Sequence, residues 1–157
     1  MVASTRGTAR HSRTVGASAQ AVYELLEDWG GLERWFPENY PVTIDRLEMI
    51  EPSDRLPLSR VIHTTDGDKV RETLLVTCPG TTRIYYTLGD GALPGVVGYV
   101  ATNMMDPIDE NSCTVTFESM FDVIDPVLGT DGARAMVQQI YTDLIGGLAT
   151  YFDRNSA

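Results

Sequence analysis

Hydrophobic residues recur at intervals of three and four along residues 133–153, a stretch without proline. Such spacing places apolar side chains on one face of an α-helix. The pattern therefore predicts a long amphipathic C-terminal helix whose apolar face covers another layer of structure. The apolar stripe consists of Met136, Val137, Ile140, Tyr141, Leu144, Leu148 and Tyr151.

Near the start of the chain the spacing of apolar residues changes from strand-like to helical. Residues 8–16 alternate weakly between polar and apolar positions, which indicates a strand. Ser18 can then cap a helix whose apolar residues recur at helical spacing as far as Trp29. A second short helix is expected around residues 32–36, because Pro37 would end it.

Between residues 42 and 121 the spacing becomes strand-like and is interrupted by clusters of turn-forming residues. We expect five strands here, joined by connections short enough for hairpins. Short connections favour an antiparallel meander over parallel strands linked by helices. The turn clusters are EPSD at 51–54, DGD at 66–68, CPG at 78–80, GDGALPG at 89–95 and DPIDEN at 106–111.

The order of elements, strand, two short helices, meander and long helix, predicts an α+β fold with the helix on one face of a sheet. A chain of 157 residues with 43% hydrophobic content suits one core. We therefore expect a single domain over residues 1–157, in which residues 1–7 form a flexible tail.

Composition narrows the range of partners. The formal charge is −10 and Lys69 is the only lysine, whereas nucleic-acid binding needs clustered Lys and Arg. We therefore expect no nucleic-acid partner. No apolar run approaches the ~20 residues of a membrane span, and the N-terminus lacks the apolar segment of a secretion signal. We expect a cytoplasmic protein without a membrane partner.

Cysteine and histidine are both scarce. Cys78 and Cys113 are too few for a disulfide framework, and His11 and His63 provide no spaced set of zinc ligands. We expect reduced thiols, no metal and no cofactor. The oligomeric state stays open, with a homodimer as one option.

One carboxylate interrupts a strand-like apolar face in DKVRETLLVT, residues 68–77. Alternation places Glu72 on a face that is otherwise apolar, where an unpaired charge is costly. One interpretation is that Glu72 pairs with an arginine such as Arg60 or Arg71. The apolar residues of this face are Val70, Leu74 and Val76.

Four segments occur in an order and spacing that resemble a known superfamily. They are SAQAVYELLEDWGGLERWFP at 18–37, KVRETLL at 69–75, YYTLGDGALPGVVGYVATNMM at 85–105 and IYTDLIGGLATYF at 140–152. Over roughly residues 8–153 the chain resembles the START/Bet v 1-like (SRPBCC) superfamily of polyketide cyclase/dehydrase proteins. The resemblance implies the helix-grip fold, in which a curved antiparallel sheet wraps around the long C-terminal helix, with two short helices after the first strand.

Members of this superfamily hold apolar small molecules in a cavity between sheet and helix, so the resemblance offers a second interpretation of Glu72 as a cavity residue. The plant abscisic-acid receptors are similar in this region. Their cavity glutamates match Glu72 in RETL and Glu118 in TFESMF, and their cavity tyrosine matches Tyr99 after GALPGVVG. Their gate sequence is absent here, so hormone perception is not implied.

The alternation pattern and the resemblance disagree on Glu118. Alternation places Val115, Phe117 and Phe121 on one face and Glu118 with Met120 on the other, which would turn Glu118 to water. The resemblance implies that Glu118 faces the cavity, and we adopt that expectation. Two carboxylates in one cavity would suit acid–base chemistry.

The candidate site therefore combines acid–base groups with an apolar wall. Glu72 and Glu118 are the candidates for proton transfer, and Tyr99 and Arg60 for stabilising enolate charge. Near the cavity mouth, Trp35 either packs its short helix onto the sheet or touches ligand, and His63 is either exposed or a general base. The remaining wall candidates are Ile62, Leu74, Tyr86, Leu88, Ala101, Asn103, Met120, Met136, Ile140 and Leu144.

Two functions are consistent with such a cavity. The favoured one is a cofactor-independent enzyme of polyketide cyclase/dehydratase type, or a related lyase, that acts on an apolar or aromatic intermediate. The alternative is a carrier or sensor that binds a hydrophobic small molecule without changing it. A structural role, in which the acidic surface serves a protein partner, is a third and weaker interpretation.

Overall fold

The computed structural model describes residues 5–156. The chain folds into seven strands and two α-helices within that range, with one 3₁₀ helix between them. The elements are β1 (Thr5–Val15), α1 (Ala19–Glu27), η1 (Trp29–Arg34), β2 (Ile44–Met49), β3 (Leu58–Thr64), β4 (Lys69–Cys78), β5 (Arg83–Leu88), β6 (Val96–Asp109), β7 (Ser112–Val123) and α2 (Gly129–Asn155).

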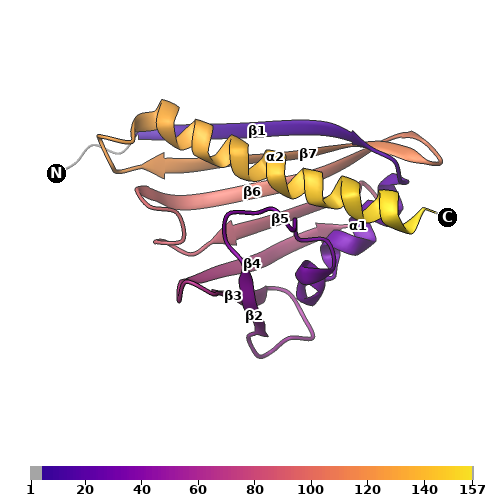
Figure 1. Ribbon diagram of the computed structural model, residues 1–157, viewed down its shortest axis with the longest axis horizontal. Coiled ribbons are helices and arrows are strands. Elements are labelled where there is room, and N and C mark those ends of the chain that lie inside the picture. The colour runs from indigo at the N-terminus through magenta and orange to yellow at the C-terminus, as the bar shows by residue number, and fades with distance from the viewer. Residues whose placement is uncertain (1–4, 157) are drawn as a thin grey trace.

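The strands form one antiparallel sheet in the order β1-β7-β6-β5-β4-β3-β2. Helix α2 lies across one face of the sheet and packs against β1 and β7 (Figure 1). This is the helix-grip arrangement, so the predicted α+β fold is confirmed. The meander holds six strands rather than the expected five, because the five turn clusters join six strands.

The N-terminal elements follow the sequence pattern with two differences. Ser18 caps α1 as predicted, since its hydroxyl accepts a hydrogen bond from the backbone N–H of Ala21 at 3.1 Å. Trp29 does not extend α1 but begins η1. Residues 5–7, expected in a flexible tail, belong to β1, where Thr5 pairs with Val123. The rest of that expected tail, residues 1–4, lies outside the described residues.

The core lies between the sheet and the helices. The inward side chains of β7, Val115, Phe117 and Phe121, are almost fully buried. Helix α2 approaches the segment after η1 closely at Gly147, where a Cβ atom would lie 2.5 Å from the carbonyl oxygen of Trp35. Because Gly147 has no Cβ atom, the segment after η1 can pack directly against the helix.

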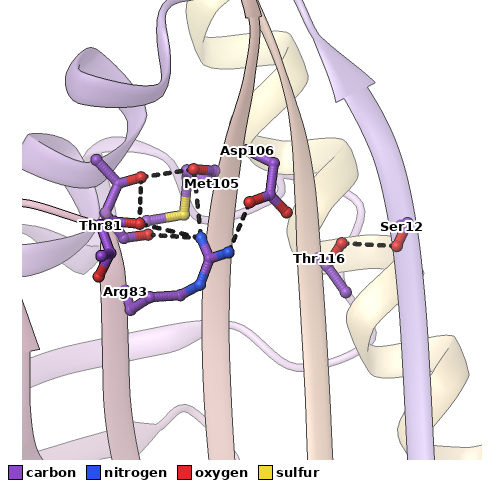
Figure 2. Close-up of polar contacts among 7 residues, drawn as sticks. Ser12, Thr81, Arg83, Met105, Asp106 and Thr116 are labelled. Carbon is purple, nitrogen blue, oxygen red and sulfur yellow. Dashed lines mark hydrogen bonds and ion pairs between the residues drawn. The ribbon is translucent and has the colours of Figure 1, made fainter.

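On the sheet face turned away from α2, side chains tie neighbouring strands together (Figure 2). The Arg83 guanidinium contacts the Asp106 carboxylate at 2.6 Å and donates to the carbonyl oxygen of Thr81 at 3.1 Å. Between β1 and β7, the hydroxyl groups of Ser12 and Thr116 are hydrogen-bonded at 2.7 Å. These contacts belong to the framework of the sheet and lie outside the cavity.

The two α-helices that the structure describes do not include one long and apolar enough to span a membrane.

Candidate functional site

A cavity of about 440 Å³ lies between the sheet, α2 and the segment around η1. A volume of this size is typical of small-molecule sites. Most of its wall is apolar, and both tryptophans of the chain, Trp29 and Trp35, contribute to it. Residues of β3, β4, β5 and β6 supply the sheet wall, and Ile140, Tyr141 and Leu144 supply the helix wall.

A buried ion pair lies in the sheet wall. Arg60 on β3 and Glu72 on β4 are directly opposite in the strand register. Glu72 Oε2 accepts from Arg60 Nε at 2.7 Å and lies 2.5 Å from Arg60 Nη2. The Arg60 side chain is 6% exposed and that of Glu72 15%. Both contacts use Oε2, and Glu72 Oε1 accepts no hydrogen bond from the described residues.

Trp29 holds Arg60 in place from the helical side. The guanidinium carbon lies 3.6 Å from the centroid of the Trp29 ring, a cation–π contact. Arg60 Nη1 also donates to the carbonyl oxygen of Trp29 at 2.8 Å. Arg60 is therefore fully engaged by Glu72 and Trp29, which leaves it little capacity to bind a ligand anion.

Three tyrosines bring their hydroxyl groups to the cavity from different elements. Tyr86 lies on β5, Tyr99 on β6 and Tyr141 on α2, and all line the cavity. The hydroxyls of Tyr99 and Tyr141 are hydrogen-bonded to each other. Burial raises the pKa of each phenol, and the negative charge of Glu72 raises it further. The three phenols therefore stay neutral at physiological pH and can donate hydrogen bonds.

Two further polar groups near the phenols lack hydrogen-bond partners. Asn103 is 4% exposed and lines the cavity, and its Oδ1 is unpartnered within the described part of the chain. Ser119 is 5% exposed, and its Oγ lies near Tyr99 and Tyr141 without making a hydrogen bond of normal geometry. Such unsatisfied buried groups are costly. Asn103 lines the cavity and Ser119 does not, so Asn103 is the candidate for direct contact with a ligand.

The mouth of the cavity lies beside two strand connections. Asp68 and Lys69, at the turn between β3 and β4, contribute one acidic and one basic side chain. Residues 91–94, in the connection between β5 and β6, lie on the wall near them. The mouth therefore carries charges of both signs.

Many of the residues proposed from the sequence do meet at this cavity. The structure brings together both proposed members of the ion pair, the proposed phenols and parts of the expected apolar wall. Those that line it are Trp35, Arg60, Ile62, Glu72, Tyr86, Leu88, Tyr99, Asn103, Ile140 and Leu144.

Glu118 and Met120 do not reach the cavity, and their expected inward orientation is wrong. The Glu118 side chain is 41% exposed and lies 3.5 Å from Arg10 Nη1 on the outer face. Met120 is 54% exposed on the same face. The inner face of β7 is occupied by Phe117 and Phe121, so the alternation pattern was the better guide than the resemblance.

Four other proposed residues also lie away from the cavity wall. Leu74 and Ala101 are buried in the core, and Met136 packs against it one helical turn before Ile140. His63 is 8% exposed, and its Nε2 lies 2.8 Å from Glu48 Oε2. Because its neighbours Ile62 and Thr64 line the cavity, alternation turns His63 to the opposite face.

The most important residue that the sequence reasoning did not assign to the site is Tyr141. It belongs to the predicted apolar stripe, next to Ile140, and a tyrosine in the buried face of a helix usually has a polar partner for its hydroxyl. That signal could have placed it near Tyr99. The sequence pattern predicts only that Trp29 belongs to a helix, and nothing in it indicates the contact with Arg60.

The fold and the enclosed cavity define the chain as a helix-grip protein. It belongs to the family described as polyketide cyclase / dehydrase and lipid transport, whose model matches residues 6–153. No curated protein matches the sequence.

Solved structures share the fold. A protein from Thermobifida fusca is 26% identical with a TM-score of 0.72, and the match covers 93% of both chains. Norcoclaurine synthase from Thalictrum flavum, in complex with dopamine and hydroxybenzaldehyde, is 16% identical with a TM-score of 0.76, covering 99% of this chain and 91% of that one. The di-domain ARO/CYC BexL from the BE-7585A biosynthetic pathway is 19% identical with a TM-score of 0.75, covering 93% of this chain and 46% of that one.

Proposed function

We propose that this protein is a cofactor-independent enzyme that removes a proton next to a ketone in an apolar or aromatic intermediate and so promotes its cyclisation or dehydration. The observation that carries the proposal is that one cavity contains both a carboxylate with an unpartnered oxygen, Glu72, and neutral phenols. Membership of the polyketide cyclase/dehydrase family supports the reaction class.

In the proposed step, Glu72 Oε1 takes a proton from the carbon beside the ketone. The electron pair moves onto the ketone oxygen, and the resulting enolate accepts hydrogen bonds from Tyr86 and Tyr99. Neutral phenols suit this role because they offer a proton where negative charge develops. Arg60 acts as a positioning residue, since it holds the carboxylate through Oε2 and leaves Oε1 for the substrate.

Ring closure then needs no further protein group. The enolate carbon attacks a second carbonyl carbon of the folded substrate, and the new alkoxide takes back the proton from Glu72. Loss of water follows when Glu72 removes a second proton from the same carbon and returns it to the departing hydroxyl group, so that the C–O bond breaks, water leaves and a C=C bond forms. The apolar wall excludes bulk water and holds the reacting carbons together.

The first half of this reaction can be tested without knowing the natural substrate. 2-Tetralone is an uncharged bicyclic ketone, and NMR in D₂O measures how fast its protons beside the carbonyl exchange. We expect the protein to accelerate this exchange above the buffer rate. Glu72→Gln should lower the protein-dependent rate by at least about 100-fold, the range of general-base effects, and Tyr99→Phe should lower it less.

Glu118→Gln is the matched control, because it makes the same change on the outer face. It should exchange at the wild-type rate. If 2-tetralone binds but exchanges only at the buffer rate, or if Glu72→Gln exchanges as fast as the control, the proposed proton transfer is refuted.

A carrier of an apolar small molecule is the second candidate. It is favoured by the engagement of Glu72 Oε2 with Arg60, which ties the carboxylate to the wall, and by the words "lipid transport" in the family description. Binding of 2-tetralone without proton exchange would support this candidate.

A further inference from the structure

Five polar residues surround one small residue on the inner face of the sheet. Ala101 is 1% exposed at the centre of β6. Its partner in the register on β5 is Tyr86, and its partner on β7 is Ser119. We call the surrounding residues the Ala101 cluster: Tyr86, Tyr99, Asn103, Ser119 and Tyr141.

The register explains why these side chains converge. Tyr99 and Asn103 lie two positions before and after Ala101 on the same strand, so they share its face. Tyr141 reaches the cluster from α2, as its hydrogen bond to Tyr99 shows. Four of the five members line the cavity, namely Tyr86, Tyr99, Asn103 and Tyr141, and Ser119 lies behind them.

The cluster contains hydrogen-bonding capacity that the protein does not use. Asn103 Oδ1 and Ser119 Oγ have no partners of normal geometry within residues 5–156. A hydroxyl group can donate and accept, and an amide can do both through its two ends. A ligand that reaches the cluster members on the cavity wall therefore meets donors as well as acceptors.

The cluster itself carries no charge, because it consists of three phenols, one hydroxyl and one amide. The buried cation of the cavity wall, Arg60, is neutralised by Glu72 and covered by Trp29. The remaining charged side chains of the wall, Asp68 and Lys69, are exposed at the mouth. A buried charge without a counterion is strongly unfavourable, so the inner end of the cavity suits an uncharged ligand group.

We infer that the Ala101 cluster binds an uncharged oxygen of the ligand, a ketone or hydroxyl oxygen, and discriminates against a carboxylate. This inference rests on the ligand-binding part of the proposed function and is independent of proton transfer. It names the ligand class as apolar molecules that carry a neutral oxygen at the end that reaches the cluster.

The test compares four probes with the same ring system: naphthalene, 2-naphthol, 2-acetylnaphthalene and 2-naphthoate. Their affinities are measured at pH 7.5 by displacement of the uncharged fluorophore N-phenyl-1-naphthylamine. We expect 2-naphthol and 2-acetylnaphthalene to bind about tenfold more tightly than naphthalene, through hydrogen bonds to the cluster. We expect 2-naphthoate to bind at least tenfold more weakly than 2-acetylnaphthalene.

Two variants identify the cluster as the source of the preference. Asn103→Leu removes the amide at similar volume, and Tyr86→Phe removes one hydroxyl. Asn103→Leu should reduce the preference of 2-naphthol over naphthalene, because 2-naphthol can donate to Asn103 Oδ1. Tyr86→Phe should reduce the preference of 2-acetylnaphthalene over naphthalene. Each reduction should be threefold or more, while the affinity for naphthalene stays the same or increases. Tyr85→Phe is the matched control, because Tyr85 is the preceding residue on β5 and is 36% exposed. It should leave every affinity unchanged.

The outcomes separate this inference from the proposed function. Equal affinities for all four probes, tight binding of 2-naphthoate, or a preference that survives in both folded variants would overturn the inference. Failure of every probe to displace the fluorophore would overturn both. A retained preference together with 2-tetralone exchange at the buffer rate would refute only the proposed enzyme. Circular dichroism establishes that each variant is folded.

Discussion

The Arg60–Glu72 pair allows a quantitative prediction about stability. In Arg60→Met, the cation is replaced by an apolar chain of similar length, and Glu72 keeps its charge in the cavity wall. Removing one partner of a buried pair costs about 3–5 kcal/mol, because the other charge is left uncompensated. The side chains of Arg60 and Glu72 are 6% and 15% exposed, so most of this cost applies.

The cavity lowers that cost somewhat, since water in it can solvate Glu72 after the change. The variant also loses the cation–π contact with Trp29, worth about 1–2 kcal/mol when desolvated. We therefore expect Arg60→Met to lower the free energy of unfolding by about 3 kcal/mol. In the double variant Arg60→Met with Glu72→Gln, no uncompensated charge remains, and about 2 kcal/mol of the loss should be recovered.

Urea denaturation followed by tryptophan fluorescence measures both effects in a double-mutant cycle. Arg10→Met is the matched control, because Arg10 and Glu118 form an exposed pair at 3.5 Å and such pairs contribute about 1 kcal/mol or less. The reasoning is refuted if Arg60→Met costs no more than Arg10→Met, or if the double variant is no more stable than Arg60→Met.

Two other predictions concern the framework around the cavity. Gly147→Ala should destabilise the protein by about 1–3 kcal/mol, since its Cβ would lie 2.5 Å from the Trp35 carbonyl oxygen. Gly146→Ala should stabilise it by up to about 1 kcal/mol, because the nearest atom to its Cβ would be Arg13 Nη1 at 3.8 Å, an ordinary contact. Equal effects in thermal unfolding would contradict this. Burial raises the pKa of the Cys113 thiol to about 11, so above pH 9 the unfolded chain loses a proton that the folded chain keeps. Cys113 should contribute about 1 kcal/mol to the fall in wild-type stability between pH 8 and pH 10, in addition to the contribution of the buried tyrosines. A Cys113→Ala variant that shows the same slope as the wild type would contradict this assignment.

Local patterns predicted the elements well, because they depend on interactions between residues close in sequence. The spacing of three and four along residues 133–153 is enough to define α2, and Ser18 marks the start of α1 through its own hydroxyl. The positions of side chains relative to the cavity depend on the sheet register, which is a long-range property. Alternation fails where the register shifts, as between Leu74 and Val76, so Val76 is 46% exposed although it shares the predicted face of Glu72.

The site was predictable only in part, because several of its contacts join segments that are far apart in the sequence. Glu72 could be recognised because it breaks an apolar pattern, and its pairing with Arg60 was one of the two interpretations considered. The inward orientation that the resemblance implies for Glu118 is wrong, because the apolar pattern of its own strand turns Glu118 to the outer face. The convergence of Tyr99 and Tyr141 joins β6 to α2, and no pattern within either segment contains that information.

The unsatisfied polar groups at the Ala101 cluster connect folding to binding. An unpaired buried polar group costs the folded state about 1–3 kcal/mol, and an apolar side chain at Asn103 would avoid that cost. A ligand hydroxyl that donates a hydrogen bond to Asn103 Oδ1 removes part of the cost only in the complex, so the same group that weakens the empty protein strengthens the bound state. Ligand binding and stability are then linked by mass action. A ligand that lacks the oxygen fills the cavity but leaves these groups unsatisfied, which is the physical basis for discrimination between molecules of nearly equal apolar area.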